Sequence, residues 1–478
     1  MIKLLVILSI IFSAPAWAAT YHVRTDGHDT NCNGSADASA ASAPNCAFLT
    51  VVKGVSTATT AGDILNVHTG DYSGEGAITS QAAGSSGSII TIQGHDTDVV
   101  TLSRIVVDHE YNKWDKFTLA NPGNSCDGSS AAIRVLKPNT TISNMKATGH
   151  DVSNCLSECP IGVLIEGTSA LTTIIENNTF DGGYWFIVFA FHRPATVQNN
   201  IIRNVIDVER IFDVLFTSSS VTDATIITGN EIHSYTSPGT KCSNHPDIFQ
   251  VVDQGGTSSA LNWVITNNYF HDCQSSIGIN EAAAVSTGWI FRNNVFANIR
   301  DQMSLLTENT KVQNNTFFQV ALTQAGVMDC SYDSVEIRNN VIIGANATST
   351  QGMINIQNEA TPTLGYNFFS LPKANSYGAR DSGAYDAIKG TGSINGGDPK
   401  LVAVYDDCVA NECNFNILVD SPLKDVGATL TGFSTDKNGV TRPQGAAWDI
   451  GAYEYNGLGS TNQISIGSGV SIGSGITF

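Results

Sequence analysis

The sequence predicts an all-β solenoid, in which short strands build coils that stack on one another. The first observation is a six-residue phrase, apolar, x, polar, Asn, x, apolar, that recurs between residues 175 and 369. Its Asn falls at positions 178, 200, 230, 268, 294, 315, 340 and 367. Self-similarity on this scale is typical of repeats that bury their apolar faces against neighbours. The second observation is that runs of Ile, Val, Phe and Thr are broken by Gly, Ser, Asn and Asp, without a long segment of 3.6-residue periodicity. Together the two observations exclude helical repeats.

The recurrent Asn is predicted to be structural. If the coils stack at the strand spacing of about 4.8 Å, each Asn lies above the Asn of the previous coil. Stacked side-chain amides can hydrogen-bond along the axis, and Asn also accepts the left-handed backbone that a sharp corner needs. With this pattern the chain resembles the right-handed parallel β-helix proteins of the pectate-lyase-like superfamily, which have an interior asparagine ladder. The resemblance implies an all-β, single-stranded right-handed parallel β-helix solenoid, with an N-terminal cap and a C-terminal capping module.

The chain is expected to divide into five segments. Residues 1–18 combine an early Lys, an apolar run and an Ala-Trp-Ala cleavage pattern, which is typical of a secretory signal. Residues 19–75 are expected to form the N-terminal cap and first coil, with a short amphipathic helix at 51–58 that covers the open end of the coil. The parallel β-helix follows at 76–400. No second apolar stretch is long enough to span a membrane, so we expect secretion to the exterior or cell surface, with the periplasm as the alternative.

Residues 401–455 are expected to form a C-terminal capping module, and residues 456–478 a tail. The module has an ordered set of short motifs: Ser421-Pro422, Asp425-Val426-Gly427, Asp436 to Gly439, Arg442-Pro443 and Asp449 to Glu454. It resembles the ending of β-helix proteins of the choice-of-anchor type. We expect Arg442 to pair with Asp449 or Glu454 while a tight loop folds over the last coil. The tail repeats an Ile-Gly-Ser-Gly hexad, which suits pairing with another chain, surface anchoring or disorder.

Charge and cysteine content restrict the partners and the compartment. The formal net charge of −19 argues against nucleic acid, and it would repel a polyanionic sugar unless local cations or bound Ca²⁺ offset the field. Ten cysteines in an exported chain favour disulfides, with local pairs expected at 32/46, 155/159 and 408/413. The partners of the other four cysteines stay open. Zinc is the competing interpretation, but only the CLSEC sequence at 155–159 has suitable spacing.

The candidate site is predicted between residues 184 and 308, where the repeat spacing grows to 30 and 38 residues and coils must carry loops. Matching apolar residues aligns RIFDV at 210–214 with DIFQV at 247–251. This places Arg210 beside Asp247 and Asp213 beside Gln250 in neighbouring coils. Further polar and aromatic residues are expected around them as substrate-binding groups: Tyr184, Trp185, His192, Arg193, Gln250 and Glu281.

This set supports two chemistries and one structural alternative. A polysaccharide lyase needs a base, for which Arg210 and His245 are candidates, and a cation such as Ca²⁺, which Asp213, Asp247 and Glu281 would bind. A glycoside hydrolase would instead use Asp213 and Asp247 as its pair of carboxyl groups. In the structural alternative, Arg210 and Asp247 form a cross-strand ion pair and the other residues are a solvated face.

The function favoured by the sequence is that of a secreted carbohydrate-active protein that acts on or binds an extracellular polysaccharide or cell-surface glycan, with lyase chemistry ahead of hydrolysis. The phrase NHPDIFQ at 244–250 resembles a His-x-Asp-x-x-Gln phrase of secreted β-helix proteins. The polygalacturonase pattern of Asn-Thr-Asp, Asp-Asp and Gly-His-Gly blocks is absent. The alternative is a non-catalytic adhesin or structural β-helix protein, because this scaffold carries many functions. The oligomeric state stays open.

Overall fold

The protein is described from a computed structural model. It covers residues 17–120, 131–148, 162–166, 172–183, 187–190, 195–205, 210–215, 224–236, 247–252, 259–280, 285–304, 307–321, 326–344, 353–356, 360–370, 377–379 and 390–457. The chain divides into two compact units, Met1–Ile201 and Ile202–Phe478, which are taken one at a time. Most of the predicted signal segment and nearly all of the hexad tail lie outside the described residues.

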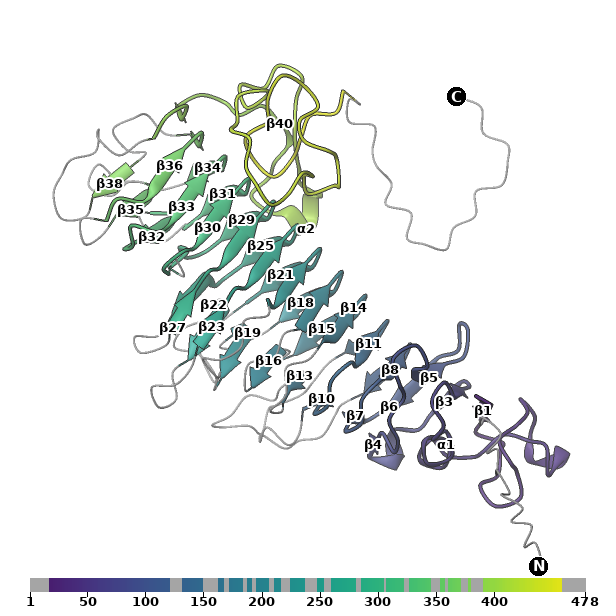
Figure 1. Ribbon diagram of the computed structural model, residues 1–478. Coiled ribbons are helices and arrows are strands. Elements are labelled where there is room, and N and C mark those ends of the chain that lie inside the picture. Colours follow the sequence, from purple (N-terminus) through teal and green to yellow (C-terminus); the bar gives the residue numbers. More distant parts are fainter. Residues whose placement is uncertain are drawn as a thin grey trace, which may run out of the picture. The chain divides into compact units, whose positions relative to one another are not determined.

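In the first unit, successive coils add parallel strands to three sheets (Figure 1). The first sheet contains β1 (Thr20–Val23), β2 (Ile64–Val67), β5 (Ile90–Gly94), β8 (Asn112–Asp115), β11 (Thr141–Ser143), β14 (Thr173–Glu176) and β17 (Ala195–Gln198). The second contains β3 (Gly70–Asp71), β6 (Val100–Leu102), β9 (Thr118–Ala120), β12 (Lys146–Thr148) and β15 (Thr179–Gly183). The third contains β4 (Ala77–Thr79), β7 (Arg104–Val107), β10 (Ile133–Val135), β13 (Val163–Ile165) and β16 (Ile187–Ala190).

The second unit repeats this plan. Its first sheet contains β20 (Ile226–Thr228), β24 (Val264–Thr266), β28 (Ile290–Arg292), β30 (Lys311–Gln313), β33 (Glu336–Arg338) and β36 (Thr363–Gly365). Its second contains β18 (Ile201–Val205), β21 (Glu231–Tyr235), β25 (Tyr269–Cys273), β29 (Val295–Ile299), β31 (Thr316–Val320), β34 (Val341–Gly344), β37 (Phe368–Phe369) and β39 (Ile394–Asn395). The remaining parallel strands are β19 (Arg210–Leu215), β22 (Asp247–Val252), β26 (Ser276–Asn280), β23 (Ser259–Leu261), β27 (Val285–Thr287), β32 (Met328–Cys330), β35 (Ile354–Ile356) and β38 (Tyr377–Ala379). The predicted parallel β-helix is therefore confirmed.

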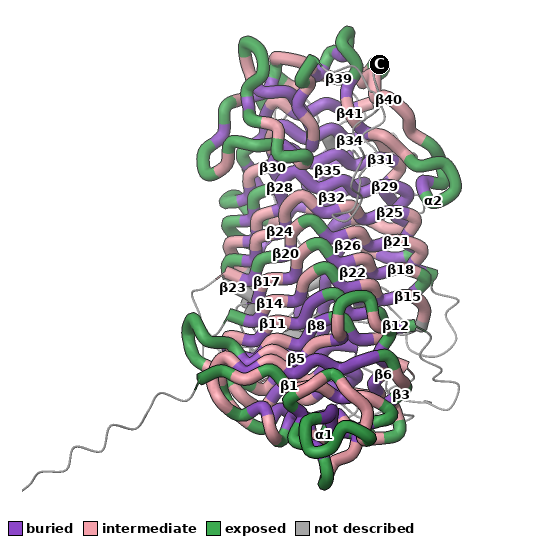
Figure 2. Tube along the Cα trace, turned by 90° about the vertical axis from the view of Figure 1, so that its right-hand side faces the viewer, coloured by how far each residue is buried: buried purple, intermediate pink, exposed green. Residues whose placement is uncertain are grey.

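The interior of each unit is apolar with one polar column. Aromatic rings stack between neighbouring coils, as in the series Phe270, Phe296 and Phe317, whose ring centroids lie 5.0 Å apart at each step. Figure 2 shows the strand segments mainly buried and many of the connecting turns exposed. Burial of these apolar side chains supplies most of the stabilisation of each coil, and a coil alone would leave them in water.

The asparagine ladder is confirmed. Within each unit, Nδ2 of a ladder Asn donates to Oδ1 of the ladder Asn in the next coil, at distances between 2.8 Å and 3.1 Å. The residues joined in this way are Asn178 with Asn200 in the first unit, and Asn230, Asn268, Asn294, Asn315, Asn340 and Asn367 in the second. Each ladder residue is at most 1% exposed. The hydrogen bonds between these amides therefore replace the hydrogen bonds to water that each buried side chain has lost.

The corner conformation belongs to a different residue than the sequence suggested. The residue before the ladder Asn is the one in the left-handed region, as in Asn267, Asn293, Asn314 and Asn339, with φ between 52° and 59°. Gly229 and Tyr366 have the same conformation at the equivalent position. The two asparagines of each pair thus have different roles. The first turns the chain, since Asn tolerates positive φ, and the side chain of the second lies in the interior.

The helix predicted at 51–58 forms as α1 (Val51–Thr57). Thr50 caps its N-terminus by accepting from the Lys53 amide, and the Glu75 carboxylate accepts from the amides of Val51 and Val52. Gly54 brings the helix against Leu65 of β2 and Val23 of β1, where an added Cβ would come within 2.8 Å of both side chains. The first unit also has the 3₁₀ turns η1 (Ala40–Ser42) and η2 (Ser73–Glu75).

The segment at 401–455 lies along several coils of the second unit, where the sequence had suggested a loop over the last coil alone. It contains the antiparallel pair β40 (Leu401–Ala403) and β41 (Asn414–Ile417) and helix α2 (Cys408–Asn411). The left-handed corner residues bind its backbone: the side chains of Asn293, Asn314 and Asn339 donate to its carbonyl oxygens. Its apolar residues pack on β29, β31, β34 and β37, and the contacts are Phe415 and Ala452 with Val295, Ala297 and Phe318, and Ile417, Leu423 and Ile450 with Val341 and Phe368. The segment packs along several coils because the outer faces of these strands are apolar, and the segment shields them from water.

Two of the three predicted local disulfides form, Cys32–Cys46 and Cys408–Cys413. Cys155 and Cys159 lie outside the described residues. Cys273 and Cys330 are buried free thiols. No helix in the described ranges is both long and apolar enough to cross a membrane.

Candidate functional site

The predicted register between the two central strands is correct. Strand β19 pairs with β22 so that Arg210 lies opposite Asp247 and Asp213 opposite Gln250. Strand β26 continues the sheet, with Ser276 opposite Asp247. One row of the sheet therefore contains Arg210, Asp247 and Ser276 from three neighbouring coils. A second row contains Asp213 and Gln250 from two of these coils.

Asp247 and Gln250 are more enclosed than an open groove would leave them. They are 2% and 1% exposed, respectively. The Ser276 hydroxyl donates a hydrogen bond to Oδ1 of Asp247. Phe249, between them in the strand, packs its ring on Phe212 with centroids 5.2 Å apart. The strand is thus anchored by a stacked aromatic pair, and its two polar side chains are held in an environment where charge is costly without partners.

The rest of the predicted set is not placed by the structure. Arg210 and Asp213 have defined strand positions only, so the geometry around their side chains stays a prediction. The following predicted residues lie outside the described ranges: Tyr184, Trp185, His192, Arg193, His245 and Glu281. Of the three carboxylates predicted to bind Ca²⁺, Asp247 alone has a described side chain.

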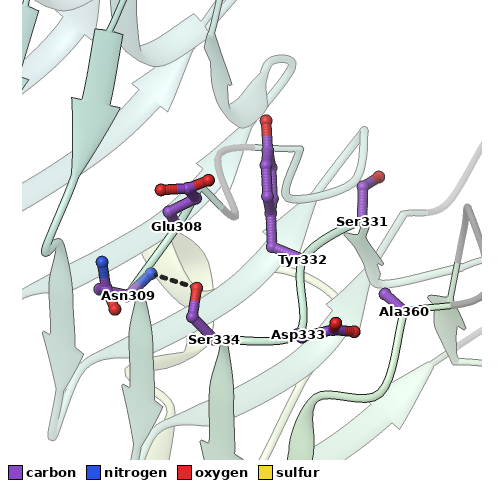
Figure 3. Close-up of a pocket in the computed structure, with 7 residues that line it drawn as sticks. All are labelled: Glu308, Asn309, Ser331, Tyr332, Asp333, Ser334 and Ala360. Atoms are coloured by element: carbon purple, nitrogen blue, oxygen red, sulfur yellow. Dashed lines mark hydrogen bonds between the residues drawn. The ribbon is translucent and has the colours of Figure 1, made fainter.

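An open cavity of about 430 Å³ lies on the second unit, at turns that join successive coils. It is lined by Glu308, Asn309, Ser331, Tyr332, Asp333, Ser334 and Ala360. Figure 3 shows the Tyr332 ring standing between Glu308 and Ser331. The Tyr332 side chain is substantially exposed, at 40%. The size is within the range of about 300 to 1,000 Å³ that small-ligand sites occupy.

The cavity walls are fixed by bonds between coils. The amide of Asn309 donates to Oγ of Ser334 at 2.8 Å, and the amide of Thr361 donates to Oδ1 of Asp333 at 2.6 Å. The carboxylates of Glu308 and Asp333 accept hydrogen bonds, whereas the Asn309 amide and the serine hydroxyls offer donors as well. An exposed aromatic face among such groups suits a ligand that is apolar on one face and rich in hydroxyls at its rim.

Two clusters of imidazole and carboxylate groups lie outside these sites. In the first unit, Nδ1 of His22 lies 3.0 Å from Nε2 of His68, and Nδ1 of His68 lies 3.2 Å from Oδ2 of Asp98. Burial lowers the pKa of both His22 and His68 below the usual histidine range. Asp37, the third group near them, accepts from Nη1 of Arg24 at 2.7 Å. Arg24 thus neutralises the Asp37 carboxylate, while Nδ1 of His95 lies 3.6 Å from Oδ2 of Asp98 on the other side of His68.

The second cluster comprises Glu231, His233 and His271 in the second unit. Neither this cluster nor the cavity was predicted. The signal for the cluster is present in the sequence: a His follows the ladder Asn by three residues in two successive coils, in GNEIHS and NNYFHD. The cavity residues at 331–334 form a turn between plain coils, and sequence spacing alone does not bring them beside Glu308.

The fold is that of a parallel β-helix protein. No family model matches the sequence, and a search of curated proteins finds no significant match. Among solved structures, pectate lyase Pel9A is similar with a TM-score of 0.51 and 15% identity, over 92% of this chain and 97% of that chain. At this identity the similarity establishes the fold alone.

Two further structures are similar at lower scores. XylC in complex with xylose has a TM-score of 0.48 and 11% identity, over 91% of this chain and 98% of that chain. Polysaccharide lyase Pedsa3628 of family PL6, from Pseudopedobacter saltans, has a TM-score of 0.45 and 12% identity, over 76% of this chain and 97% of that chain.

Proposed function

We propose that this protein is a secreted carbohydrate-active β-helix protein that binds an extracellular polysaccharide and cleaves it by lyase-type β-elimination. The observation that carries the binding part of this proposal is the cavity around Tyr332. Its exposed ring offers a platform for a sugar face, and the carboxylates of Glu308 and Asp333 accept hydrogen bonds from sugar hydroxyls. All of these groups are attached to stacked coils, so little ordering accompanies binding.

The bond-breaking step is assigned to the row of Arg210 and Asp247. Removal of a proton beside a uronate carboxylate needs a base and a cation to stabilise the enolate. Arg210 or His245 would be the base, and Asp213, Asp247 and Glu281 would bind Ca²⁺. The same carboxylates, Asp213 and Asp247, would serve a hydrolase as acid and base, which is the second chemistry to test.

Charge decides which polysaccharide suits the cavity. Its two carboxylates have no cationic residue among the lining groups, and the whole chain has a net charge of −19. A neutral glycan therefore binds there directly, whereas a polyuronate needs Ca²⁺ between its carboxylates and those of the protein. Binding of an acidic polysaccharide should consequently depend on Ca²⁺.

The test of binding is affinity electrophoresis of the purified mature chain through gels that contain neutral or acidic polysaccharides, with Ca²⁺ or chelator. Tyr332→Ala should weaken retardation at least about fivefold, since an aromatic contact contributes roughly 1 kcal/mol. Tyr332→Phe should keep most of it. Tyr405→Ala is the matched control, because Tyr405 has a similar exposure of 44% but lies outside the cavity. Equal retardation of the wild type and Tyr332→Ala would overturn the assignment of this cavity.

A further inference from the structure

The second histidine cluster is built on the outer side of two neighbouring strands. Glu231 and His233 are two residues apart on β21, so they share one face of the sheet, while Ile232 between them is fully buried. Strand β25 pairs in parallel with β21 and places His271 directly opposite His233. Three potential metal ligands are therefore positioned by paired strands and not by loops.

The distances within the cluster suit a shared ligand. Nε2 of His271 lies 3.2 Å from Oε1 of Glu231. The two imidazole rings are nearly parallel, with centroids 4.8 Å apart and an angle of 15° between planes. One ligand atom from each of the three residues lies within 4.8 Å of the other two. Atoms that share an ion at about 2.0 to 2.2 Å lie at most about 4.4 Å apart, so a small rotation of the partly exposed Glu231 and His233 side chains brings all three atoms onto one ion.

The other nitrogen of each imidazole is already held. Nδ1 of His233 lies 3.0 Å from Oγ of Ser234, and Nδ1 of His271 lies 2.7 Å from Oδ2 of Asp272. Ser234 and Asp272 both have positive φ, 56° and 52°, and this conformation is what turns each side chain back onto the ring beside it. A carboxylate on the far nitrogen of a histidine is the arrangement that orients metal-binding imidazoles.

Asp272 is itself rigid. Its carboxylate accepts from Nδ2 of Asn298 at 2.8 Å and from the amide of Cys408 at 3.1 Å. His271 is 3% exposed and stacks on Tyr269, with ring centroids 4.0 Å apart. The imidazole can therefore neither rotate nor retreat into solvent, and its Nε2 stays aimed at Glu231.

From this geometry we propose that Glu231, His233 and His271 bind a divalent transition-metal ion of the zinc type through one carboxylate oxygen and two Nε2 atoms, with Asp272 orienting His271. Two imidazoles and a carboxylate suit zinc, which prefers nitrogen ligands with few oxygens, and not Ca²⁺, which wants six to eight oxygens. Three protein ligands leave a coordination position open.

The competing arrangement has no metal. In it, a protonated His271 bridges the carboxylates of Glu231 and Asp272. Although burial lowers the pKa of His271, the hydrogen bonds that its ring donates to Asp272 and Glu231 outweigh this effect and raise the pKa above the usual range. That bridge, however, gives no role to His233, whose ring lies parallel to that of His271 with centroids 4.8 Å apart. A metal ion uses both imidazoles, and this difference makes the two arrangements separable.

The test is a zinc titration of the chelator-treated, desalted full chain, followed by calorimetry and by elemental analysis of metal content. The wild type should bind zinc, and His271→Ala and His233→Ala should each lose an equivalent. Asp272→Asn should keep the stoichiometry but weaken affinity about 10- to 100-fold. Substitution by Co²⁺ should give visible absorption bands that disappear in His233→Ala.

Controls separate this site from others and from misfolding. His22→Ala removes an imidazole from the first-unit network. This variant should still bind the equivalent of zinc that His233→Ala and His271→Ala lose. Because His271→Ala removes a buried side chain, Glu231→Gln and His233→Ala supply partly exposed alternatives, each checked by circular dichroism. Zinc should raise the thermal midpoint of the wild type but not of His233→Ala. Zinc stoichiometry and affinity that are the same in the wild type and in a His233→Ala, Glu231→Gln double variant would overturn the proposal.

Discussion

Arg442 forms a completely buried ion pair with Glu454. Nη1 of Arg442 lies 2.8 Å from Oε2 of Glu454, and both side chains are 0% exposed. The guanidinium also donates to the carbonyl oxygens of Asp449 and Gly451, at 3.1 Å and 2.9 Å. The sequence had left Asp449 and Glu454 as alternative partners. The carboxylate is that of Glu454, while Asp449 contributes a backbone oxygen, so one arginine holds together the segment that covers the second unit.

Removing one partner of this pair should be strongly destabilising. Arg442→Met leaves the Glu454 carboxylate buried and uncompensated, which should cost about 3 to 5 kcal/mol of unfolding free energy. Chemical denaturation followed by tryptophan fluorescence measures the change. The double variant Arg442→Met, Glu454→Leu should recover much of the loss, because no buried charge remains. A single variant as stable as the wild type would show that the pair is not buried in solution.

The asparagine ladder should be sensitive at its centre. Asn294 donates to the carbonyl oxygen of Ile265 and to Oδ1 of Asn315, and its Oδ1 accepts from Asn268. Asn294→Ala removes a hydrogen-bond partner from the carbonyl oxygen of Ile265 and from the backbone amide and Nδ2 of Asn268, whereas Oδ1 of Asn315 keeps the backbone amide of residue 294. We expect a loss of at least about 3 kcal/mol, at roughly 1 to 3 kcal/mol for each group. Asn31→Ala is the control on an exposed turn and should change stability by less than about 0.5 kcal/mol. Equal unfolding free energies of the wild type and Asn294→Ala would contradict a stabilising role of the ladder.

The Cys32–Cys46 disulfide closes a loop with a sequence separation of 14 in the first unit. A loop of this size should contribute about 3 kcal/mol through the reduced entropy of the unfolded chain. The variant Cys32→Ala, Cys46→Ala should lower the denaturation midpoint by a corresponding amount. Reducing agent should lower the denaturation midpoint of the wild type. It should also lower the midpoint of the Cys408→Ala, Cys413→Ala variant, because this variant keeps the Cys32–Cys46 disulfide. If reducing agent has no effect on that variant, the first disulfide is not the stabilising one.

Lys437 should give the second unit an unusual pH dependence. Burial lowers the pKa of Lys437 to about 8, and its Nζ donates to the carbonyl oxygen of Asn267 at 2.5 Å. Between pH of about 8 and the ordinary lysine pKa of about 10.4, the unfolded chain binds more protons than the folded one, so stability rises with pH. The unfolding free energy of the wild type should therefore rise relative to Lys437→Met across this window. A constant difference between the two proteins would argue against a depressed lysine pKa.

The repeat determined how much of this fold was predictable. Eight recurrences of one phrase located the ladder, and the match of apolar residues gave the pairing of Arg210 with Asp247 in the correct register. These succeed because strand stacking forces identical positions of successive coils together. The same logic extends to His233 and His271, which stand three residues after their ladder asparagines.

Contacts between unlike segments were harder to predict. The packing of the segment at 421–455 along the outer faces of β29, β31 and β34 joins residues far apart in the sequence, such as Val341 with Leu423 and Val295 with Ala452, and no repeat relates them. Burial of Asp247 was missed for a similar reason: the pattern fixes which residues face one another, whereas enclosure depends on what covers the strand. The left-handed role of Asn314 was assigned to its neighbour, because both asparagines suit a turn.

The measurement that tests the central claim most directly is turnover of a polysaccharide panel by the purified protein, with Ca²⁺ and with chelator, followed by absorbance of unsaturated products and by reducing ends. We predict Ca²⁺-dependent unsaturated products from a polyuronate, reduced at least about a hundredfold in Asp247→Asn, with Asp301→Asn as a control on a nearby coil. Reducing ends without unsaturation would move the chemistry to hydrolysis. No product and no binding across neutral and acidic polysaccharides, from a folded protein, would contradict the account and leave a non-catalytic adhesin or structural β-helix protein.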